Sequence, residues 1–394
     1  MQKTPSSERL HIGFFGRCNS GKSSLINALT GQQVALVSSQ AGTTTDPVNK
    51  PMELPGLGAV VIIDTPGLDD NTTLGEQRIA ATRKVLERTD IAVVLFGEGE
   101  DLSIEKALCE ELKRREIPMV GVLAACDRTS EPESIAARIG EVIGVEPICT
   151  SATRAEGLDT LRAKLAECRG DEERLLTQGL CDEGDTVLLV MPQDKQAPKG
   201  RLIQPQVQTL RELLDRGCRA MCCTTEDMPE ALKALSSPPK LIITDSQVFD
   251  AVWKLKPEES LLLTSFSVLM ARYKGDINAF IEGAKVLATL TEQSRVLIAE
   301  ACTHAPQNED IGRVKLPRML RKRVGEGLAI DIVGGADFPE DLSPYDLIIH
   351  CGACMFNRRH VMSRVARAKG ANVPITNYGV AIAALMGILN KIEW

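Results

Sequence analysis

Two kinds of hydrophobic pattern alternate along this chain. Short, fully apolar runs such as residues 11–15, 59–63 and 119–123 are followed by stretches in which apolar residues recur every three or four positions. The first kind is typical of strands buried in a parallel sheet, and the second of helices that cover such a sheet. The alternation predicts an α/β protein.

The predicted elements fall into three groups. At 394 residues the chain is too long for one ordinary core, and a charged stretch at residues 167–185 is typical of a linker. We therefore predict three domains, at residues 1–170, 171–257 and 258–394, the last two being smaller parallel-sheet α/β domains. The strands expected in them are 186–191, 219–223 and 241–244, then 261–264, 294–299, 329–333 and 347–350.

The composition of the chain narrows the class of protein to which it can belong. Hydrophobic residues make up 43% and charged residues 25%, as in globular proteins, and the net charge of -7 argues against non-specific binding of nucleic acid. The apolar run at 380–389 is too short to span a bilayer and predicts a buried helix instead. We see no signal peptide and expect a cytoplasmic protein whose cysteines are mostly reduced.

The residues 16–23, GRCNSGKS, join the first strand to a helix that begins at Lys22. Glycines in such a loop turn backbone N–H groups towards phosphate, and the helix N-terminus adds its positive end. Lys22 should reach the β- and γ-phosphates, and Ser23 should bind Mg²⁺. The residues expected around the phosphates are Gly16, Ser20, Gly21, Lys22, Ser23 and Ser24. These features predict a P-loop GTPase domain.

Two further segments complete this predicted site. Strand 59–63 leads to Asp64, expected behind the Mg²⁺ ion, and to Gly67, whose backbone can sense the γ-phosphate. The loop 42–46 is polar, and Thr44 in it is the expected ligand of Mg²⁺; an ordinary threonine-rich turn is the alternative. We expect Lys22, Ser23, Thr44, Asp64 and Gly67 to carry hydrolysis.

To about residue 170 the chain resembles the Era/TrmE branch of GTPases, through GRCNSGKSSLINAL, AGTTTD, DTPGL and CTSA. The resemblance implies that Ser151 and Ala152 back a guanine base. Asp127 keeps the carboxylate that can accept hydrogen bonds from guanine N1 and N2. The preceding Asn and Lys of the family pattern are missing, because Ala124 and Ala125 stand there, so base affinity should be weak.

The same resemblance bears on the rate of hydrolysis. Leu68 stands where Ras-like enzymes have a glutamine that orients water, and an apolar side chain cannot do this. In the Era/TrmE branch a monovalent cation helps, held partly by an asparagine in the loop, and Asn19 matches that position. Slow, potassium-stimulated hydrolysis of GTP is implied.

Soft metal ligands gather near the end of the chain. Cys302 and His304 follow one predicted strand, and Cys351 and Cys354 follow another. The carboxyl ends of parallel strands meet at one edge of a sheet, where ligands bind. Such a set can hold a structural zinc ion or a 4Fe-4S cluster with three protein thiolates. His304 is the best candidate for a fourth ligand, whereas His350 and His360 are expected to be strand and helix partners.

Over nearly all its length the chain resembles the FeFe-hydrogenase maturation GTPase family, HydF. The matching features are the GTPase domain, the middle α/β module, and the CTH and HCGAC motifs at 302–304 and 350–354. The resemblance implies a homodimeric scaffold that carries a 4Fe-4S cluster on Cys302, Cys351 and Cys354. It also implies a di-iron precursor passed to apo FeFe-hydrogenase, with radical-SAM maturases as further partners.

Two other classes of protein are alternatives. An RNA-modification or ribosome-assembly GTPase with a C-terminal zinc site should carry a basic surface with stacking aromatics, but aromatics are only 3% of the chain. A radical enzyme should carry the CxxxCxxC spacing, which is absent. A basic run at 313–323, with six Lys or Arg and no acid, is either a patch for an anion or a solvated helix face.

Overall fold

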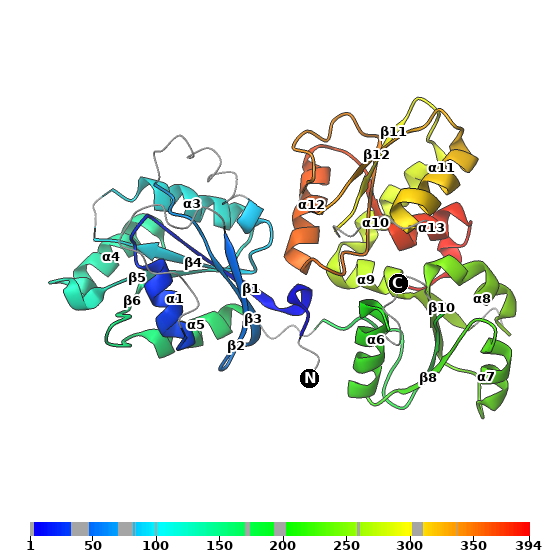
Figure 1. Ribbon diagram of the computed structural model, residues 1–394, viewed down its shortest axis with the longest axis horizontal. Helices are drawn as coiled ribbons and strands as arrows, with labels where there is room; N and C mark the ends of the chain where they lie inside the picture. Colours follow the sequence, from blue (N-terminus) through cyan, green and yellow to red (C-terminus); the bar gives the residue numbers. More distant parts are fainter. Residues whose placement is uncertain are drawn as a thin grey trace. The chain divides into compact units, whose positions relative to one another are not determined.

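A computed structural model describes residues 4–32, 47–69, 82, 84–98, 101–169, 174–192, 202–257, 261–301, 310–335 and 337–394. The chain forms two compact units, Met1–Glu172 and Glu173–Trp394 (Figure 1). Sheets of mainly parallel strands covered by helices make up both units, so the expected α/β class is confirmed.

The first unit is built on a sheet whose described strands run in the order β2-β3-β1-β4-β5-β6. Neighbouring strands are parallel except β2, which runs antiparallel to β3. The strands are β1 (Leu10–Gly16), β2 (Val48–Leu54), β3 (Gly58–Asp64), β4 (Ile91–Phe96), β5 (Met119–Leu123) and β6 (Ile148–Cys149). The central strands are buried on both faces, which explains why they are apolar without alternation.

Helices cover both faces of this sheet (Figure 1). Leu25 and Leu29 of α1 (Lys22–Thr30) pack with Leu161 of α5 (Leu158–Arg169) on one face. On the other face lie α3 (Ser103–Arg114) and α4 (Pro132–Ile143). The three-to-four-residue spacing of their buried side chains is the amphipathic pattern seen in the sequence.

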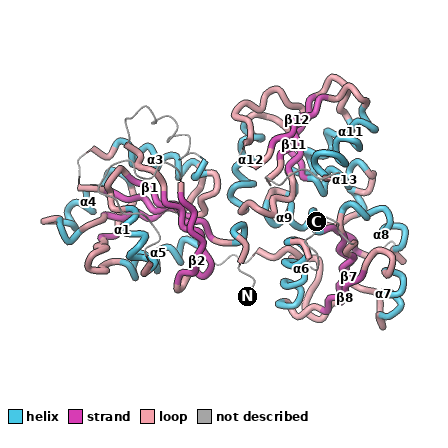
Figure 2. Tube along the Cα trace, viewed as in Figure 1, coloured by secondary structure: helices cyan, strands magenta, loops and turns pink. Residues whose placement is uncertain are grey.

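The second unit holds two fully parallel sheets in its described residues, drawn in magenta in Figure 2. The middle sheet has the order β10-β9-β7-β8. Its elements are β7 (Thr186–Val190), α6 (Gln204–Asp215), β8 (Arg219–Cys223), α7 (Met228–Ala234), β9 (Leu241–Thr244), α8 (Phe249–Leu255), β10 (Leu262–Ser265) and α9 (Phe266–Lys274).

The last sheet has the order β12-β11-β13-β14. Its elements are α10 (Ile277–Lys285), β11 (Arg295–Ala299), a π-helical turn (Ile311–Lys315), α11 (Leu316–Val324), β12 (Ala329–Val333), β13 (Leu347–His350), α12 (Arg358–Gly370), β14 (Ile375–Asn377) and α13 (Tyr378–Leu385). Every residue of α13 from Tyr378 to Ala383 is buried, so a buried helix is confirmed for the first part of the run predicted at 380–389. The helix ends at Leu385, and Gly387 is exposed.

One continuous hydrophobic core joins the middle and last sheets. It includes Leu188 of β7 and Ile242 of β9 together with Val296 of β11 and Ile348 of β13. The chain end adds a further link, because the amide of Glu393 donates to the carbonyl of Leu263 at 2.9 Å.

One strand assignment was wrong. Residues 261–264 were expected to begin the last sheet, but β10 pairs with β9 in the middle sheet. An apolar run predicts a strand without predicting its neighbour, which depends on tertiary packing. The domain boundary at 257/258 stays a prediction, and this pairing favours a later one.

Candidate functional site: a nucleotide loop and a cysteine-bearing sheet edge

The glycine-rich loop lies at the carboxyl end of β1, between two neighbouring strands. Phe14 of β1 is in register with Asp64 at the end of β3, and Gly16 with Leu95 of β4. Gly21 ends the loop with φ of 88°, a left-handed conformation that favours glycine, and α1 starts at the next residue. Ser24 lies in the first turn of that helix. The loop and helix are thus arranged as phosphate binding requires.

The Lys22 side chain is only 8% exposed and turns back over the loop. Its Nζ atom donates to the carbonyl oxygens of Gly16 at 3.0 Å and Arg17 at 2.7 Å. Burial lowers the pKa of Lys22, and the charge of Asp64 opposes part of that shift. The ammonium group is therefore held over the loop.

Ser23 and Asp64 are in contact. The Ser23 hydroxyl donates to Asp64 Oδ2 at 3.0 Å. Burial raises the pKa of Asp64, whereas the Ser23 hydrogen bond and the Lys22 charge act in the opposite direction. A hydroxyl beside a buried carboxylate is the pair that holds Mg²⁺ in P-loop enzymes.

Gly67 packs directly against the glycine-rich loop. A Cβ atom at this position would lie 2.2 Å from Cys18 Sγ and 2.7 Å from Cys18 N, so a side chain does not fit. The next residue, Leu68, packs against the hydrophobic cluster that contains Phe15 and Ile63. Leu68 is thus an apolar packing residue and offers no group to orient water.

The two segments predicted to read the base lie side by side. The amide of Cys126 donates to the Thr150 carbonyl at 3.0 Å, and the Thr150 amide to the Leu123 carbonyl at 2.9 Å. Asp127 Oδ2 accepts from Thr153 Oγ1 at 2.9 Å, and hydrogen bonds from Ser151 and Thr153 lower the pKa of Asp127.

Ser151 is fully buried, and Ala152 is half-buried beside it. Asp127 and the 149–152 segment therefore converge at the carboxyl ends of β5 and β6.

Other parts of the predicted nucleotide site are placed as follows. Asn19 is exposed, with φ of 58°. The Ser20 hydroxyl is buried under the loop with no hydrogen-bond partner among the described residues. Thr44 and its loop 42–46 lie outside the described residues.

The cysteine-bearing edge belongs to β11 and β13. These strands are parallel neighbours, with Ala299 in register with His350, and the Cys351 amide donates to the Ala299 carbonyl at 2.9 Å. The expectation that the two strands adjoin is confirmed. Cys302 and His304 lie outside the described residues, but Ala301, which immediately precedes Cys302, is at this edge.

The sulfur of Cys351 accepts two backbone hydrogen bonds. The donors are the amides of Ala301 at 2.9 Å and Ala353 at 3.4 Å. Burial raises the pKa of the Cys351 thiol to about 11, although both amides lower it. A bound metal deprotonates a coordinating thiol outright, and N–H groups aimed at sulfur stabilise the resulting thiolate. Cys351 is therefore suited to metal ligation.

His350, the last residue of β13, precedes Cys351 and is fully buried. Arg364 Nη1 lies 3.0 Å from His350 Nε2, and His350 Nδ1 lies 2.8 Å from the Cys351 carbonyl oxygen. Because a guanidinium only donates, Nε2 accepts, and Nδ1 carries the proton and donates to Cys351. Burial and the Arg364 charge lower the pKa of His350 to about 3. Both ring nitrogens of His350 form hydrogen bonds. The expectation that this histidine supports the strand is therefore confirmed.

The loop that carries Cys354 is shaped by a left-handed alanine. Ala353 has φ of 51° and is buried. Lys274, itself only 2% exposed, donates to the carbonyl oxygens of Ala353 at 3.2 Å and Phe356 at 2.9 Å. Asn357 then caps α12 by accepting from the amide of His360. In the described part of the chain, no three His, Cys, Asp or Glu side chains form a metal-holding group.

The basic side chains at 313–323 differ in their partners and in their exposure. Arg313 pairs with the buried Glu300 at 3.0 Å, and Lys315 donates to Gln247 at 3.1 Å. Arg318, Lys322 and Arg323 are exposed on α11. The charge left for an anion is therefore concentrated on that helix.

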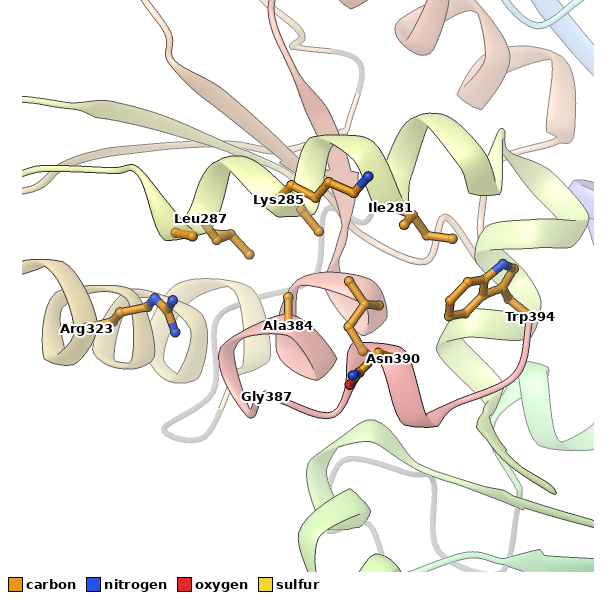
Figure 3. Close-up of a pocket in the computed structure, with 11 residues that line it drawn as sticks. Ile281, Lys285, Leu287, Arg323, Ala384, Gly387, Asn390 and Trp394 are labelled. Atoms are coloured by element: carbon orange, nitrogen blue, oxygen red, sulfur yellow. The ribbon is translucent and has the colours of Figure 1, made fainter. Parts of the chain in front are cut away.

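A separate cavity of about 350 Å³ lies among α10, α11 and α13. Figure 3 shows Arg323, Ala384 and Trp394 around it. None of the described residues that line this cavity belongs to the predicted nucleotide or metal site.

Sequence reasoning missed several residues that shape these sites. Asp69, two positions after Gly67, contacts the glycine-rich loop. Lys274 and Arg364 are buried cations at the cysteine-bearing edge. The acidic residue after DTPGL was a usable signal for Asp69, whereas Lys274 and Arg364 look like ordinary surface positions of amphipathic helices.

Family models match three consecutive parts of the chain. Residues 11–125 match a 50S ribosome-binding GTPase model. Residues 176–275 match the hydrogen maturase F dimerization domain, and residues 278–392 match the hydrogen maturase F tetramerization domain. The chain belongs to the hydrogen maturase F family. Its N-terminal unit is a GTPase domain that binds GTP and Mg²⁺, and the other models support an oligomeric protein.

Relatives of this hydrogen maturase F chain outside the family share its GTPase domain. A tRNA modification GTPase MnmE from Chromobacterium violaceum is 36% identical over 41% of this chain and 35% of its own length. A GTPase Der from Campylobacter concisus is 36% identical over 32% of this chain and 28% of its own length. The chain thus spans only about a third of these relatives.

Among solved structures, Era with MgGDPNP and a segment of 16S ribosomal RNA is 17% identical. That match covers 57% of this chain and 97% of Era, with a TM-score of 0.37.

Among the described residues, none of the helices has the length and apolarity needed to cross a membrane.

Proposed function

We propose that this chain is a scaffold and carrier in the maturation of FeFe-hydrogenase. It holds a 4Fe-4S cluster on Cys302, Cys351 and Cys354, with His304 as a possible fourth ligand. It also carries a di-iron precursor for transfer to apo-hydrogenase, after exchange with radical-SAM maturases. The site of action is the cytoplasm, and the working form is at least a homodimer.

The observation that carries this proposal is the chemistry of Cys351. Its sulfur accepts amides from both Ala301 and Ala353, at an edge where the neighbouring strand leads directly to Cys302. Cys354 is close enough for its charge to act on Cys351. Thiolates with N–H donors at a ligand-binding edge fit an iron-sulfur cluster. The cluster, when bound, supplies an iron site to which cargo can attach.

The chain's own residues would hold and shield that group. Buried Lys274 fixes the 351–356 loop through two carbonyl oxygens, and His350 fixes the Cys351 carbonyl. Membership in the hydrogen maturase F family supports the same reading. A tRNA-modifying role has less support, since the likeness to those GTPases covers 41% of this chain.

The GTPase domain would act as a switch. We propose that it hydrolyses GTP slowly and that potassium, held partly by Asn19, stimulates it. Thr44 and Ser23 would bind Mg²⁺, and Asp64 would support it from behind. Nucleotide state would alter contacts with partners by roughly 1–3 kcal/mol, rather than act on the cluster chemically.

The proposal is tested by anaerobic reconstitution of the full chain with iron and sulfide. Iron, sulfide and zinc would be measured per chain, together with electron paramagnetic resonance. Wild type should hold about four irons with a 4Fe-4S signal, as a site of three thiolates allows. Cys302→Ala, Cys351→Ala and Cys354→Ala should each lose that signal, whereas His304→Ala should keep a cluster with an altered one.

The matched control is Cys222→Ala, which removes an exposed cysteine of β8. It should reconstitute like wild type. Stoichiometric zinc in place of iron, or a full-strength unchanged signal in any of the three cysteine variants, would contradict the assignment.

A further inference from the structure

Asp69 is attached to the glycine-rich loop. Its Oδ1 atom accepts a hydrogen bond from the backbone amide of Cys18 at 2.6 Å. Next to it, the amide of Leu68 donates to the carbonyl of Gly16 at 3.2 Å. The segment after β3 therefore binds the first half of the loop at two points, and one of them uses a negatively charged side chain.

The amide of Cys18 is one of the backbone N–H groups of the glycine-rich loop, and N–H groups of such loops cradle phosphate oxygens in P-loop proteins. It lies at the end of the loop that touches Gly67, because a Cβ on Gly67 would lie 2.7 Å from Cys18 N. Gly67 is the residue expected to sense the γ-phosphate. Lys22, expected to reach the β- and γ-phosphates, places its Nζ atom on the carbonyl oxygens of Gly16 and Arg17, next to Cys18. Cys18 therefore lies at the end of the loop where the terminal phosphate is expected.

Two cations lie near the Asp69 carboxylate, and both have other partners. The charge of Lys22 interacts with Asp69, but the Lys22 ammonium group donates to the carbonyl oxygens of Gly16 and Arg17. Arg17 is bound by Glu105, with Nε at 2.8 Å from Oε1 and Nη2 at 3.1 Å from Oε2, and it also donates to the Asp101 carbonyl. Among the described residues, the Asp69 carboxylate accepts its hydrogen bond from the Cys18 amide. A γ-phosphate that approached this amide would meet a like charge.

We propose that Asp69 is an internal competitor of the γ-phosphate and thereby sets the preference of the domain between GTP and GDP. With GDP the carboxylate stays on the Cys18 amide and the 67–69 segment remains docked. With GTP the terminal phosphate takes that amide and the segment is released. The inference deepens the switch part of the proposed function and rests on the GTPase domain, independently of the cluster.

The test is equilibrium binding of fluorescent GDP and of a fluorescent, non-hydrolysable imido analogue of GTP to the full chain with Mg²⁺. Asp69→Asn keeps the side-chain shape and removes the charge. It should bind the GTP analogue at least about fivefold more tightly, since hydrogen bonds to charged groups are the stronger ones, and should change GDP affinity by less than about twofold. Asp69→Ser should shift the ratio in the same direction.

The matched control is Asp159→Asn, which makes the same charge change at a side chain 97% exposed on α5. It should leave both affinities unchanged. An unaltered ratio in both Asp69 variants, or a parallel change for both nucleotides, would overturn the inference. If wild type bound neither nucleotide, the GTP-binding assignment itself would fail and this inference with it; a failed cluster reconstitution would leave it standing.

Discussion

The Nζ atom of Lys274 lies 3.2 Å from the carbonyl oxygen of Ala353, the residue that precedes Cys354, and donates a hydrogen bond to it. This places a buried positive charge beneath the loop that carries two of the three proposed thiolate ligands. The same ammonium group binds the Phe356 carbonyl, so it fixes the loop at both ends of a short span.

Lys274→Met should therefore loosen the loop. The change leaves two buried carbonyl oxygens without their donor, which should lower the free energy of unfolding by about 1–3 kcal/mol in urea. Iron retained after reconstitution should fall as well. Lys369→Met is the control, because Lys369 forms a half-exposed pair with Asp276 and such pairs contribute about 0–1 kcal/mol. Equal losses in both variants would argue against a special role for Lys274.

Lys22→Ala should abolish hydrolysis of GTP while leaving the cluster content unchanged. Lys22 is the buried cation over the phosphate loop, and loss of a charge-stabilising donor typically costs at least about a hundredfold in rate. Phosphate release would be measured under single-turnover conditions. Lys164→Ala, which removes an exposed partner of Glu167, should behave like wild type. Hydrolysis that survives in Lys22→Ala would refute the assignment.

Potassium should stimulate turnover several-fold over sodium at equal ionic strength, and Asn19→Ala should remove the difference. The reason is that Leu68 packs against the hydrophobic core and cannot orient water, so another group must stabilise the developing charge. Asn372→Ala serves as control, since Asn372 shares the left-handed backbone, with φ of 55°, outside the GTPase domain. Equal rates of GTP hydrolysis by the wild type in the two salts would show that potassium does not assist the reaction.

Asp127→Asn should weaken guanine nucleotide binding by about tenfold and relax selectivity against adenine nucleotides. An amide cannot accept two hydrogen bonds from guanine N1 and N2 through the pair of oxygens that a carboxylate offers. Competition of GDP and ADP for a fluorescent guanine nucleotide would measure the effect. If selectivity stayed the same, the base would be recognised by other residues.

Much of this molecule could be predicted from local pattern. The loop at 16–23 and the strands that lead to Asp64 and Cys351 are contiguous segments. Their backbone conformation can be predicted from the residue types within each segment. The pairing of β10 could not be predicted, because strand order depends on packing between distant segments. Strand β14 was missed, since Ile375–Asn377 is too short to show a period.

Side-chain partners were the least predictable feature. The Asp69 contact with Cys18 joins segments 51 positions apart, and the Lys274 contact with Ala353 joins segments 79 positions apart. The acidic residue after DTPGL indicates Asp69 but does not indicate its partner. Lys274 is not marked at all, because Lys at a helix end is a common surface choice. Such contacts arise from the fold and become visible only in three dimensions.

The most direct test of the scaffold role is activation of apo FeFe-hydrogenase. The full chain would be loaded anaerobically with iron and sulfide in the presence of the radical-SAM maturases, isolated, and mixed with apo-hydrogenase while hydrogen evolution is measured. Wild type and Cys222→Ala should activate the hydrogenase, whereas Cys351→Ala should not. Activation by Cys351→Ala equal to that of wild type, or a loaded wild type that holds zinc and activates nothing, would contradict the account.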